Sequence, residues 1–164
     1  MTQIKTTILA LGSNLGDRQT NLIKATALIS NRIGKIIAQS SVVETEPWRF
    51  VSEYPFVNQI IIVHSTLSAE AILASTQQIE KELGRITKST DGHYTDRLID
   101  IDLIDYNGEI IEKNHLQLPH PHMHERLFVL TPLCEILPTW EHPIFHKTAQ
   151  ELNDELRAYN ENQH

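Results

Sequence analysis

The sequence predicts an α+β protein with a mainly antiparallel sheet and helices packed on its faces. Short β-branched runs alternate with longer segments of helical periodicity, and successive strand runs are close enough to be joined by hairpins or loops. The predicted order is β-α-β-β-α-β-β-α-α. The chain has 164 residues, 40% of them hydrophobic, and no internal repeat or linker-like stretch. We therefore expect a single domain over residues 1–164.

The chain begins with a predicted strand and helix. Residues 6–11 have the β-branched content of a buried strand and end at a turn signal, Gly12-Ser13-Asn14. The helix should begin after the N-cap residue Asp17 and end at Gly34. Its core-facing residues at helical spacing would be Leu22, Ala25, Ile29 and Ile33.

Two more strands and a second helix follow. Residues 36–44 and 56–65 read as strands, and the aromatic, proline-bounded loop 45–55 between them is longer than a hairpin needs, which is typical of a binding element. Ser68 should cap the second helix and Gly84 should end it. Its inward residues would be Ile72, Leu73, Thr76, Ile79 and Leu83.

The second half opens with a polar loop, 85–96, which we expect to be mobile. The run RLIDIDLIDYNG at 97–108 then predicts a strand that ends in an Asn107-Gly108 type I′ hairpin signal, with a returning strand at 109–111. Residues 123–136 read as a helix, and a last helix should cover about 148–159. The core candidates of the helix at 123–136 are Phe128, Leu130 and Leu133.

Two aspartates interrupt the apolar run at 97–108. Side chains alternate along a strand, so Asp100 and Asp102 should share one face while Ile99, Ile101 and Leu103 face the core. A rise of two residues separates the aspartates by roughly 6.6 Å, which lets both lean onto shared hard cations. Oxygen ligands of this kind favour Mg²⁺ with substrate phosphates. The alternative is a solvated strand face whose charges only keep it soluble.

Histidines alternate downstream at His120, His122 and His124, with His115 before them and Arg126 after. Alternate histidines suggest zinc, but the prolines between them disfavour a regular strand, and no Cys or Glu completes a zinc spacing. One histidine that donates a hydrogen bond to phosphate beside Arg126 is the more economical interpretation.

Charge and composition exclude several classes. A net charge of −7 argues against a general nucleic-acid partner. No apolar run reaches the roughly 18 residues that span a bilayer, and the N-terminus has no signal-peptide core. Cys134 is the one cysteine, so no intramolecular disulfide can form, and we interpret it as a small hydrophobe. The expectation is a cytoplasmic protein with no membrane partner.

Six blocks, in order along the chain, together resemble the 6-hydroxymethyl-7,8-dihydropterin pyrophosphokinase family of folate biosynthesis. Each block alone is weak, but six in register are specific. They are LGSN at 11–14, TEP at 45–47, FVN at 56–58, Q..E...GR at 77–85, R..DIDL at 97–103 and LPHP..HER.FVL.PL at 118–133.

This resemblance implies an enzyme with a ferredoxin-like core. The implied reaction transfers the β,γ-diphosphoryl group of ATP to the pterin hydroxymethyl oxygen, giving AMP and the pterin diphosphate. The implied partners are therefore ATP and 6-hydroxymethyl-7,8-dihydropterin, with two Mg²⁺ ions as cofactors. Separately, we expect the chain to be a monomer that binds no nucleic acid.

The resemblance also implies roles for individual residues. Asp100 and Asp102 would hold the metal, and Arg85, Arg97 and Asp100 would serve catalysis, with Asp100 a candidate for the deprotonation step. Phe56 and Phe128 would clamp the flat pterin. The full pterin set would be Thr45, Pro47, Trp48, Phe56, Asn58 and Phe128, and the ATP set would be Gln77, Glu80, Lys88, Arg97, Leu103, His120 and Arg126.

Two rival functions stay open on the sequence. One is a metal-dependent phosphohydrolase that uses the aspartates and histidines. The other is a module that binds a nucleotide or pterin without turnover. The reaction products separate the first from a pyrophosphokinase, and the effect of Asp102→Ala on turnover separates the second.

Overall fold

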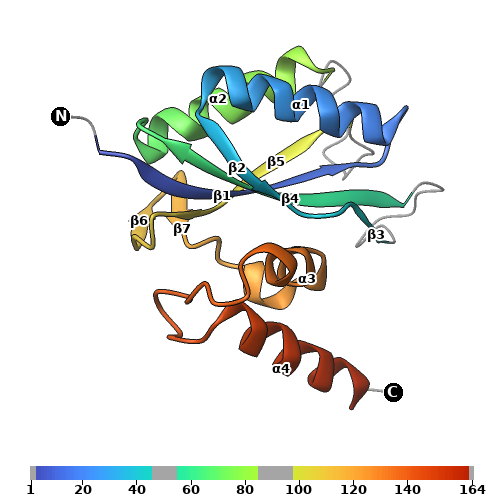
Figure 1. The fold of residues 1–164 in the computed structure, drawn as a ribbon, viewed down its shortest axis with the longest axis vertical. Helices are drawn as coiled ribbons and strands as arrows, with labels where there is room; N and C mark the ends of the chain where they lie inside the picture. The colour runs from blue at the N-terminus through green and yellow to red at the C-terminus, as the bar shows by residue number, and fades with distance from the viewer. Residues whose placement is uncertain (1–2, 46–54, 85–97, 163–164) are drawn as a thin grey trace.

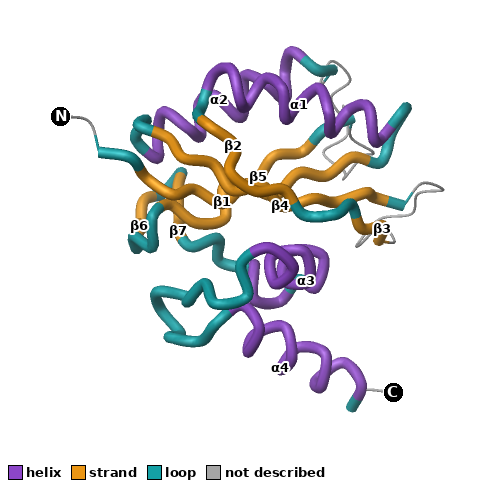
Figure 2. The backbone as a smooth tube through the Cα atoms, viewed as in Figure 1, coloured by secondary structure: helices purple, strands orange, loops and turns teal. Residues whose placement is uncertain are grey.

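Residues 3–45, 55–84 and 98–162 are described in a computed structural model of the chain (Figure 1). The helices α1 and α2 lie on one face of the central sheet, α3 lies on the other face, and α4 packs against α3 farther from the sheet (Figure 2). None of the helices in these residues has the length and apolar content to cross a membrane. The elements are β1 (Lys5–Ser13), α1 (Arg18–Arg32), β2 (Lys35–Gln39), β3 (Val43–Thr45), β4 (Phe56–Ser65), α2 (Ala69–Glu82), β5 (Asp100–Tyr106), β6 (Ile111–Lys113), β7 (Leu116–Leu118), the 3₁₀ helix η1 (Met123–Glu125), α3 (Leu127–Ile136) and α4 (Ala149–Glu161).

The central sheet has the strand order β2-β4-β1-β5, and β3 also pairs with β4. Every pairing in it is antiparallel. If β2 and β3 are counted as two parts of one strand, the spatial order is second-third-first-fourth, and α1 and α2 are the crossovers. This is the ferredoxin-like β-α-β-β-α-β arrangement. The predicted α+β class and antiparallel sheet are confirmed.

The sheet face under α1 and α2 carries the larger core. Leu9 and Leu11 of β1 and Ile101 and Leu103 of β5 are each at most 6% exposed there. Burial of such side chains is the main stabilising contribution to a domain of this size. The helices cover them with the predicted residues Leu22, Ala25, Ile29, Ile72 and Ile79.

Both predicted helices begin and end where their capping residues indicate. The side chains of Asp17 and Ser68 accept backbone N–H groups in the first turns of α1 and α2. Gly84 follows α2 with a φ of 124°, a helix-ending conformation. Gly34 follows α1 for a different reason, because its φ is not positive. A Cβ there would lie 2.1 Å from the carbonyl oxygen of His64, so glycine is needed where the chain passes against β4.

A second core lies between the sheet and the α3–α4 pair. Ile8, Ile60, Ile62 and Ile104 of the sheet pack there against the helices. Of the predicted core residues of α3, Leu130 and Leu133 are fully buried, whereas Phe128 is only partly buried at the edge of this core. Phe128 therefore keeps part of its ring available.

The predicted strand 36–44 is wrong as one element, because it is broken into β2 and β3. The backbone N–H of Ser40 donates to the carbonyl of Ile60, but the Ser40 hydroxyl then accepts the Ile60 N–H in place of a backbone carbonyl. A side chain that replaces the ladder partner in this way ends regular pairing. The Glu135 carboxylate accepts the N–H and hydroxyl of Ser41, which holds the break.

The predicted returning strand at 109–111 is also wrong. The turn itself forms, with Asn107 and Gly108 at φ 54° and 70°, as a type I′ turn requires. The strand that follows starts at Ile111 and pairs with β7 instead of β5. Leu116 and Leu118 of β7 are buried against the α1–α2 core, so apolar burial decides this pairing.

The region 123–136 is not one helix. It is the short helix η1 followed by α3, and Arg126 between them is extended, with φ −125° and ψ 105°. The last helix is confirmed. It begins after Thr148, whose hydroxyl accepts the Glu151 N–H while the Glu151 carboxylate accepts the Thr148 N–H.

Candidate active site

On the sheet face toward α3 and α4, the side chains change from apolar to polar at the end that carries Gly12. Ala10 of β1 lies opposite Asp102 of β5, and Gly12 lies opposite both Asn58 of β4 and Asp100 of β5. Residues directly opposite in antiparallel strands share a face. The apolar rows of the α3–α4 core therefore give way to a row of polar side chains from β4 and β5, on either side of the small residues Ala10 and Gly12 of β1.

Asp100 and Asp102 have the orientation that strand alternation predicts. Both are half-buried, while Ile101 and Leu103 beside them lie in the α1–α2 core. Two carboxylates on one face, about 6.6 Å apart along the strand, are a donor set that fits Mg²⁺. Within the described ranges no three His, Cys, Asp or Glu side chains come together as a metal cluster.

Asn58 and Thr45 form the second part of the site. The Asn58 side-chain nitrogen donates to the Thr45 hydroxyl at 2.8 Å, and Asn58 is 7% exposed. Gly12 lies against this pair: a Cβ there would lie 3.2 Å from the Asn58 side-chain oxygen and 3.6 Å from Cδ1 of the Phe56 ring. A glycine inside a strand often marks such a close approach. Gly12, Asn58 and Phe56 are therefore direct neighbours.

His120 is fixed beside β5 as a neutral hydrogen-bond donor. Its backbone N–H donates to the Ile104 carbonyl at 2.8 Å, and its Nδ1 accepts the backbone N–H of His122 at 3.1 Å. Burial, with smaller contributions from the charges of Arg126 and His122, lowers the pKa of His120 to about 4. A neutral ring that accepts at Nδ1 carries its proton on Nε2, which can donate to an anionic oxygen.

The other two alternating histidines have separate partners. His122 lies 3.2 Å from the Glu125 carboxylate, and the His124 ring meets the edge of Phe145 at 4.8 Å between centroids. The His122 ring also lies 6.1 Å from the His120 ring between centroids, in a T-shaped arrangement.

Arg126 and Phe128 lie at the start of α3. The Arg126 guanidinium carbon is 5.7 Å from the centre of the Phe128 ring, a cation–π distance. The helix α3 packs against β3 and β4, the strands that carry Thr45 and Asn58. Charge and aromatic surface are thus combined at the start of the helix that covers these strands.

The other three described residues of the expected ATP set differ in their exposure and contacts. Gln77 is exposed on α2. Glu80 is 4% exposed, and its carboxylate accepts the backbone N–H of Ile101 at 2.8 Å. The Leu103 side chain is buried in the α1–α2 core, so only its backbone could meet a nucleotide.

Five expected site residues lie outside the described residues. They are Pro47, Trp48, Arg85, Lys88 and Arg97.

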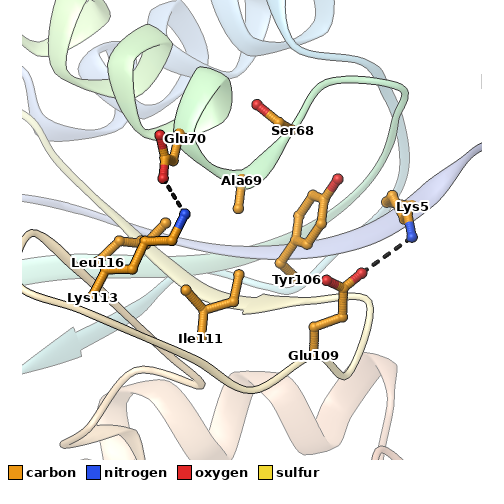
Figure 3. A pocket seen from close by; sticks show the side chains of 9 residues that line it. All are labelled: Lys5, Ser68, Ala69, Glu70, Tyr106, Glu109, Ile111, Lys113 and Leu116. Carbon is orange, nitrogen blue, oxygen red and sulfur yellow. Dashed lines mark hydrogen bonds and ion pairs between the residues drawn. The ribbon is translucent and has the colours of Figure 1, made fainter.

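An open cavity of about 420 Å³ lies at the other end of β1 and β5, roughly 23 Å along β1 from Gly12 (Figure 3). The charged side chains in its wall pair with one another, Lys5 with Glu109 at 3.1 Å and Lys113 with Glu70. The Tyr106 hydroxyl donates to the Leu67 carbonyl. This end lacks the paired aspartates and the amide–hydroxyl pair of the polar row.

Comparison with known proteins decides the family. Residues 8–138 match the family of 7,8-dihydro-6-hydroxymethylpterin-pyrophosphokinase (HPPK). The chain belongs to this family. Three relatives share the name 2-amino-4-hydroxy-6-hydroxymethyldihydropteridine pyrophosphokinase. The protein from Porphyromonas gingivalis is 45% identical over 136 residues, covering 82% of this chain and 92% of the relative. The Bacillus subtilis protein is 41% identical (78% and 75% covered), and the Aquifex aeolicus protein is 35% identical (92% and 91% covered).

Solved structures agree with the HPPK fold. Plasmodium falciparum HPPK-DHPS wild type superposes with a TM-score of 0.79 at 14% identity, covering 100% of this chain and 47% of that one. The same wild-type protein with pterin and p-hydroxybenzoate gives a TM-score of 0.78 at 15% identity, covering 100% and 45%. The chain thus spans about half the length of these crystallised chains, and the likeness supports the ferredoxin-like fold alone.

Sequence reasoning missed two features of this candidate site. Gly12 was expected in a turn but lies inside β1, because its pairing with β4 and β5 continues the strand to Ser13. Glu80 was expected beside the nucleotide but contacts the strand that carries the aspartates. No local pattern reveals that contact, because it depends on how α2 docks against β5.

Proposed function

We propose that this chain transfers the β,γ-diphosphoryl group of ATP to the hydroxymethyl oxygen of 6-hydroxymethyl-7,8-dihydropterin, giving AMP and the pterin diphosphate. Membership of the HPPK family supports this reaction. The observation that carries it is the polar row on the sheet face toward α3, where Asn58 of β4 and the aspartates Asp100 and Asp102 of β5 lie on the two strands that flank β1. This arrangement supports a site for a heterocycle beside a site for a charged phosphate chain.

The pterin would bind at the Gly12 end of β1. Asn58 and Thr45 are oriented by their mutual hydrogen bond, and their remaining donor and acceptor positions would pair with the amide and amino edge of the pterin. Phe56 lies two residues before Asn58 on β4, and Phe128 lies on α3. Two aromatic rings suit a planar bicycle because they offer contact area with little loss of rotamer entropy.

Asp100 and Asp102 would hold two Mg²⁺ ions with the triphosphate. Bound Mg²⁺ would neutralise the phosphate charge that otherwise repels an attacking oxygen. The protein's own contribution is to keep two carboxylates on one face of a paired strand. We assign Asp100 as the candidate acceptor of the hydroxyl proton, because it lies opposite Gly12, next to the expected pterin position.

The triphosphate would meet donors from other segments. The Nε2–H of neutral His120 and the guanidinium of Arg126 come from the described residues. Arg85, Lys88 and Arg97 are further candidates from the family resemblance, Arg97 and Arg85 for catalysis. Arginine suits this role because its planar fork matches phosphate oxygens.

The direct experiment incubates the protein with ATP, Mg²⁺ and 6-hydroxymethyl-7,8-dihydropterin and separates the products. We expect AMP and pterin diphosphate in equal amounts, and none when the pterin is left out. Inorganic phosphate released without pterin would instead indicate a phosphohydrolase. Binding of both ligands with no product under any condition would indicate a non-catalytic module.

We also propose that the chain acts as a single-domain monomer in the cytoplasm. The one central sheet with a core on each face supports the single domain. Light scattering during size-exclusion chromatography tests the monomer directly, since a dimer would double the mass of 18.8 kDa.

A further inference from the structure

A buried carboxylate contacts the strand that carries both aspartates. Glu80, near the end of α2, is 4% exposed. Its Oε2 accepts the backbone N–H of Ile101 at 2.8 Å. Ile101 is the residue between Asp100 and Asp102, so Glu80 holds the backbone midway between the two proposed metal ligands.

This contact lies on the outer edge of β5. Among the described strands of the central sheet, β5 pairs only with β1. In an antiparallel pair the N–H and C=O of one residue point together toward the partner strand or away from it. An N–H donated to α2 is therefore one that points away from β1. Glu80 takes the place that a further strand would occupy.

The surrounding packing keeps α2 close to the start of β5. Ile79 and Ile99, one from each segment, are both buried in the α1–α2 core. Gly84 lies against Leu98: a Cβ on Gly84 would be 2.2 Å from the Leu98 Cδ1 atom. The Glu80 hydrogen bond is thus the polar part of a docking contact that covers residues 98–101.

We propose that Glu80 is a positioning residue for Asp100 and Asp102. Glu80 fixes the β5 backbone between them so that both carboxylates meet the same phosphate-bound cations. The proposal rests on the function proposed above. It assigns Glu80 a role through the strand, in place of the nucleotide contact expected from the family resemblance. A hydrogen bond to a carboxylate is about twice as strong as a neutral one, which suits a backbone that must not shift.

The test compares three substitutions with an exposed neighbour. Glu80→Gln keeps an oxygen that can accept the Ile101 N–H, Glu80→Met has similar length without an acceptor, and Glu80→Asp keeps the charge but withdraws the acceptor. Lys81→Gln, exposed on the same helix, is the matched control. Affinity for Mn²⁺ is measured by electron paramagnetic resonance with a non-hydrolysable ATP analogue present. Hydrogen exchange of the Ile101 amide is followed by NMR.

We expect Glu80→Met and Glu80→Asp to weaken Mn²⁺ binding by about tenfold or more, the usual range for loss of an orienting partner of a metal ligand. The Ile101 amide should exchange faster in both. Glu80→Gln should stay within about threefold of wild type in both measurements, and pterin affinity should be unchanged in all variants. If Glu80→Met does not fold, Glu80→Asp carries the same comparison.

Two results would overturn the proposal. One is wild-type Mn²⁺ affinity in Glu80→Met or, where that variant does not fold, in Glu80→Asp. The other is that Glu80→Gln lowers the affinity for the ATP analogue as much as Glu80→Met does, while the hydrogen exchange of the Ile101 amide is unchanged. That result would indicate that Glu80 contacts the nucleotide directly. Because Mn²⁺ binding is measured without turnover, these results are separate from failure of the proposed reaction, which would appear as absence of AMP from the wild-type protein.

Discussion

The two faces of the central sheet are made by the same strands but have opposite character at one end. Leu11 of β1 and Ile101 of β5 lie opposite each other in the core under α1 and α2. One step along each strand, Gly12 and Asp100 lie opposite each other on the other face, with Asn58 on the neighbouring strand. A buried face and a candidate site are therefore separated by one residue in each strand.

This difference shows how the core can position the site. Because side chains alternate with a period of two, a register slip of one residue would exchange the faces and bury Asp100 and Asp102. The apolar residues on the α1–α2 face make that slip costly. The register that buries Leu11 and Ile101 is the same one that presents the aspartates together.

The substitution with the largest expected effect is Asp102→Asn, which removes one of the two carboxylates from the polar face. We expect the rate of AMP formation to fall by about a thousandfold, because a neutral amide holds a divalent cation poorly, while thermal unfolding stays as in wild type. Glu112→Gln, exposed on β6, is the control and should keep the wild-type rate. An Asp102→Asn protein with unchanged rate would remove these carboxylates from the reaction.

Substitution of Leu103, the residue after Asp102, should lower stability and leave substrate binding intact. Leu103→Ala deletes a side chain that is 6% exposed, so we expect the free energy of unfolding to drop by about 3 kcal/mol in urea titrations. Pterin affinity of the folded fraction should change little. If stability were unaffected while pterin binding was lost, the assignment of the two faces would be wrong.

The segment between α3 and α4 should be sensitive to acid. His142 is 2% exposed, and its Nδ1 accepts the N–H groups of Ile144 and Phe145. Burial, with smaller contributions from His124 and His146, lowers the pKa of His142 to about 4. In the unfolded chain that pKa is near 6.5, so the unfolded state binds more protons between pH 4 and 6.5. Stability should be retained above pH 6.5 and fall as the pH drops toward 4.

His142→Ala tests this assignment. At pH 7 we expect a loss of about 2 kcal/mol in the free energy of unfolding, because two backbone N–H groups lose their acceptor. The fall in stability between pH 6.5 and 4 should also become shallower in the variant. A pH dependence as steep as that of the wild type would assign the effect to His120, whose pKa is also lowered to about 4.

Gly12→Ala tests whether the pterin binds beside Gly12. The added Cβ would meet the Asn58 side-chain oxygen at 3.2 Å, so Asn58 must shift by a few tenths of an ångström, while the Phe56 ring at 3.6 Å would be in ordinary contact. We expect pterin affinity to fall about tenfold by calorimetry, with affinity for an ATP analogue unchanged. Equal loss for both ligands would mean that Gly12 supports the strand instead of the pterin site.

The smallest effect should come from the far end of β1. Lys5→Met removes the ion pair with Glu109, which is partly exposed and is expected to contribute about 0.5 kcal/mol or less. The reaction rate should stay within twofold of wild type. A larger loss of rate would show that the cavity at that end takes part in the reaction.

The parts of the fold that sequence reasoning predicted are those fixed by local interactions. Asp17 and Ser68 cap helices within one turn of chain, and the alternation around Asp100 follows from strand geometry. The break at Ser40 depends on a hydrogen bond to β4, and the β6–β7 pairing depends on burial of Leu116 and Leu118 by distant helices. Such contacts cannot be read from one segment.

The candidate site divides in the same way. Asp100 and Asp102 could be predicted because motif and strand pattern agree on them, and Asn58 from the family resemblance; the structure brings all three onto one face. The contributions of Gly12 and Glu80 could not, since one depends on the distance between side chains on neighbouring strands and the other on the docking of α2. Both are properties of the assembled sheet.

The central claim is that Asp100 and Asp102 jointly bind divalent cations with the triphosphate. The most direct measurement is anomalous diffraction from crystals grown with Mn²⁺, a non-hydrolysable ATP analogue and the pterin. We predict two Mn²⁺ peaks between these carboxylates and the phosphate oxygens. Mn²⁺ on the phosphates with neither aspartate as a ligand would contradict the account.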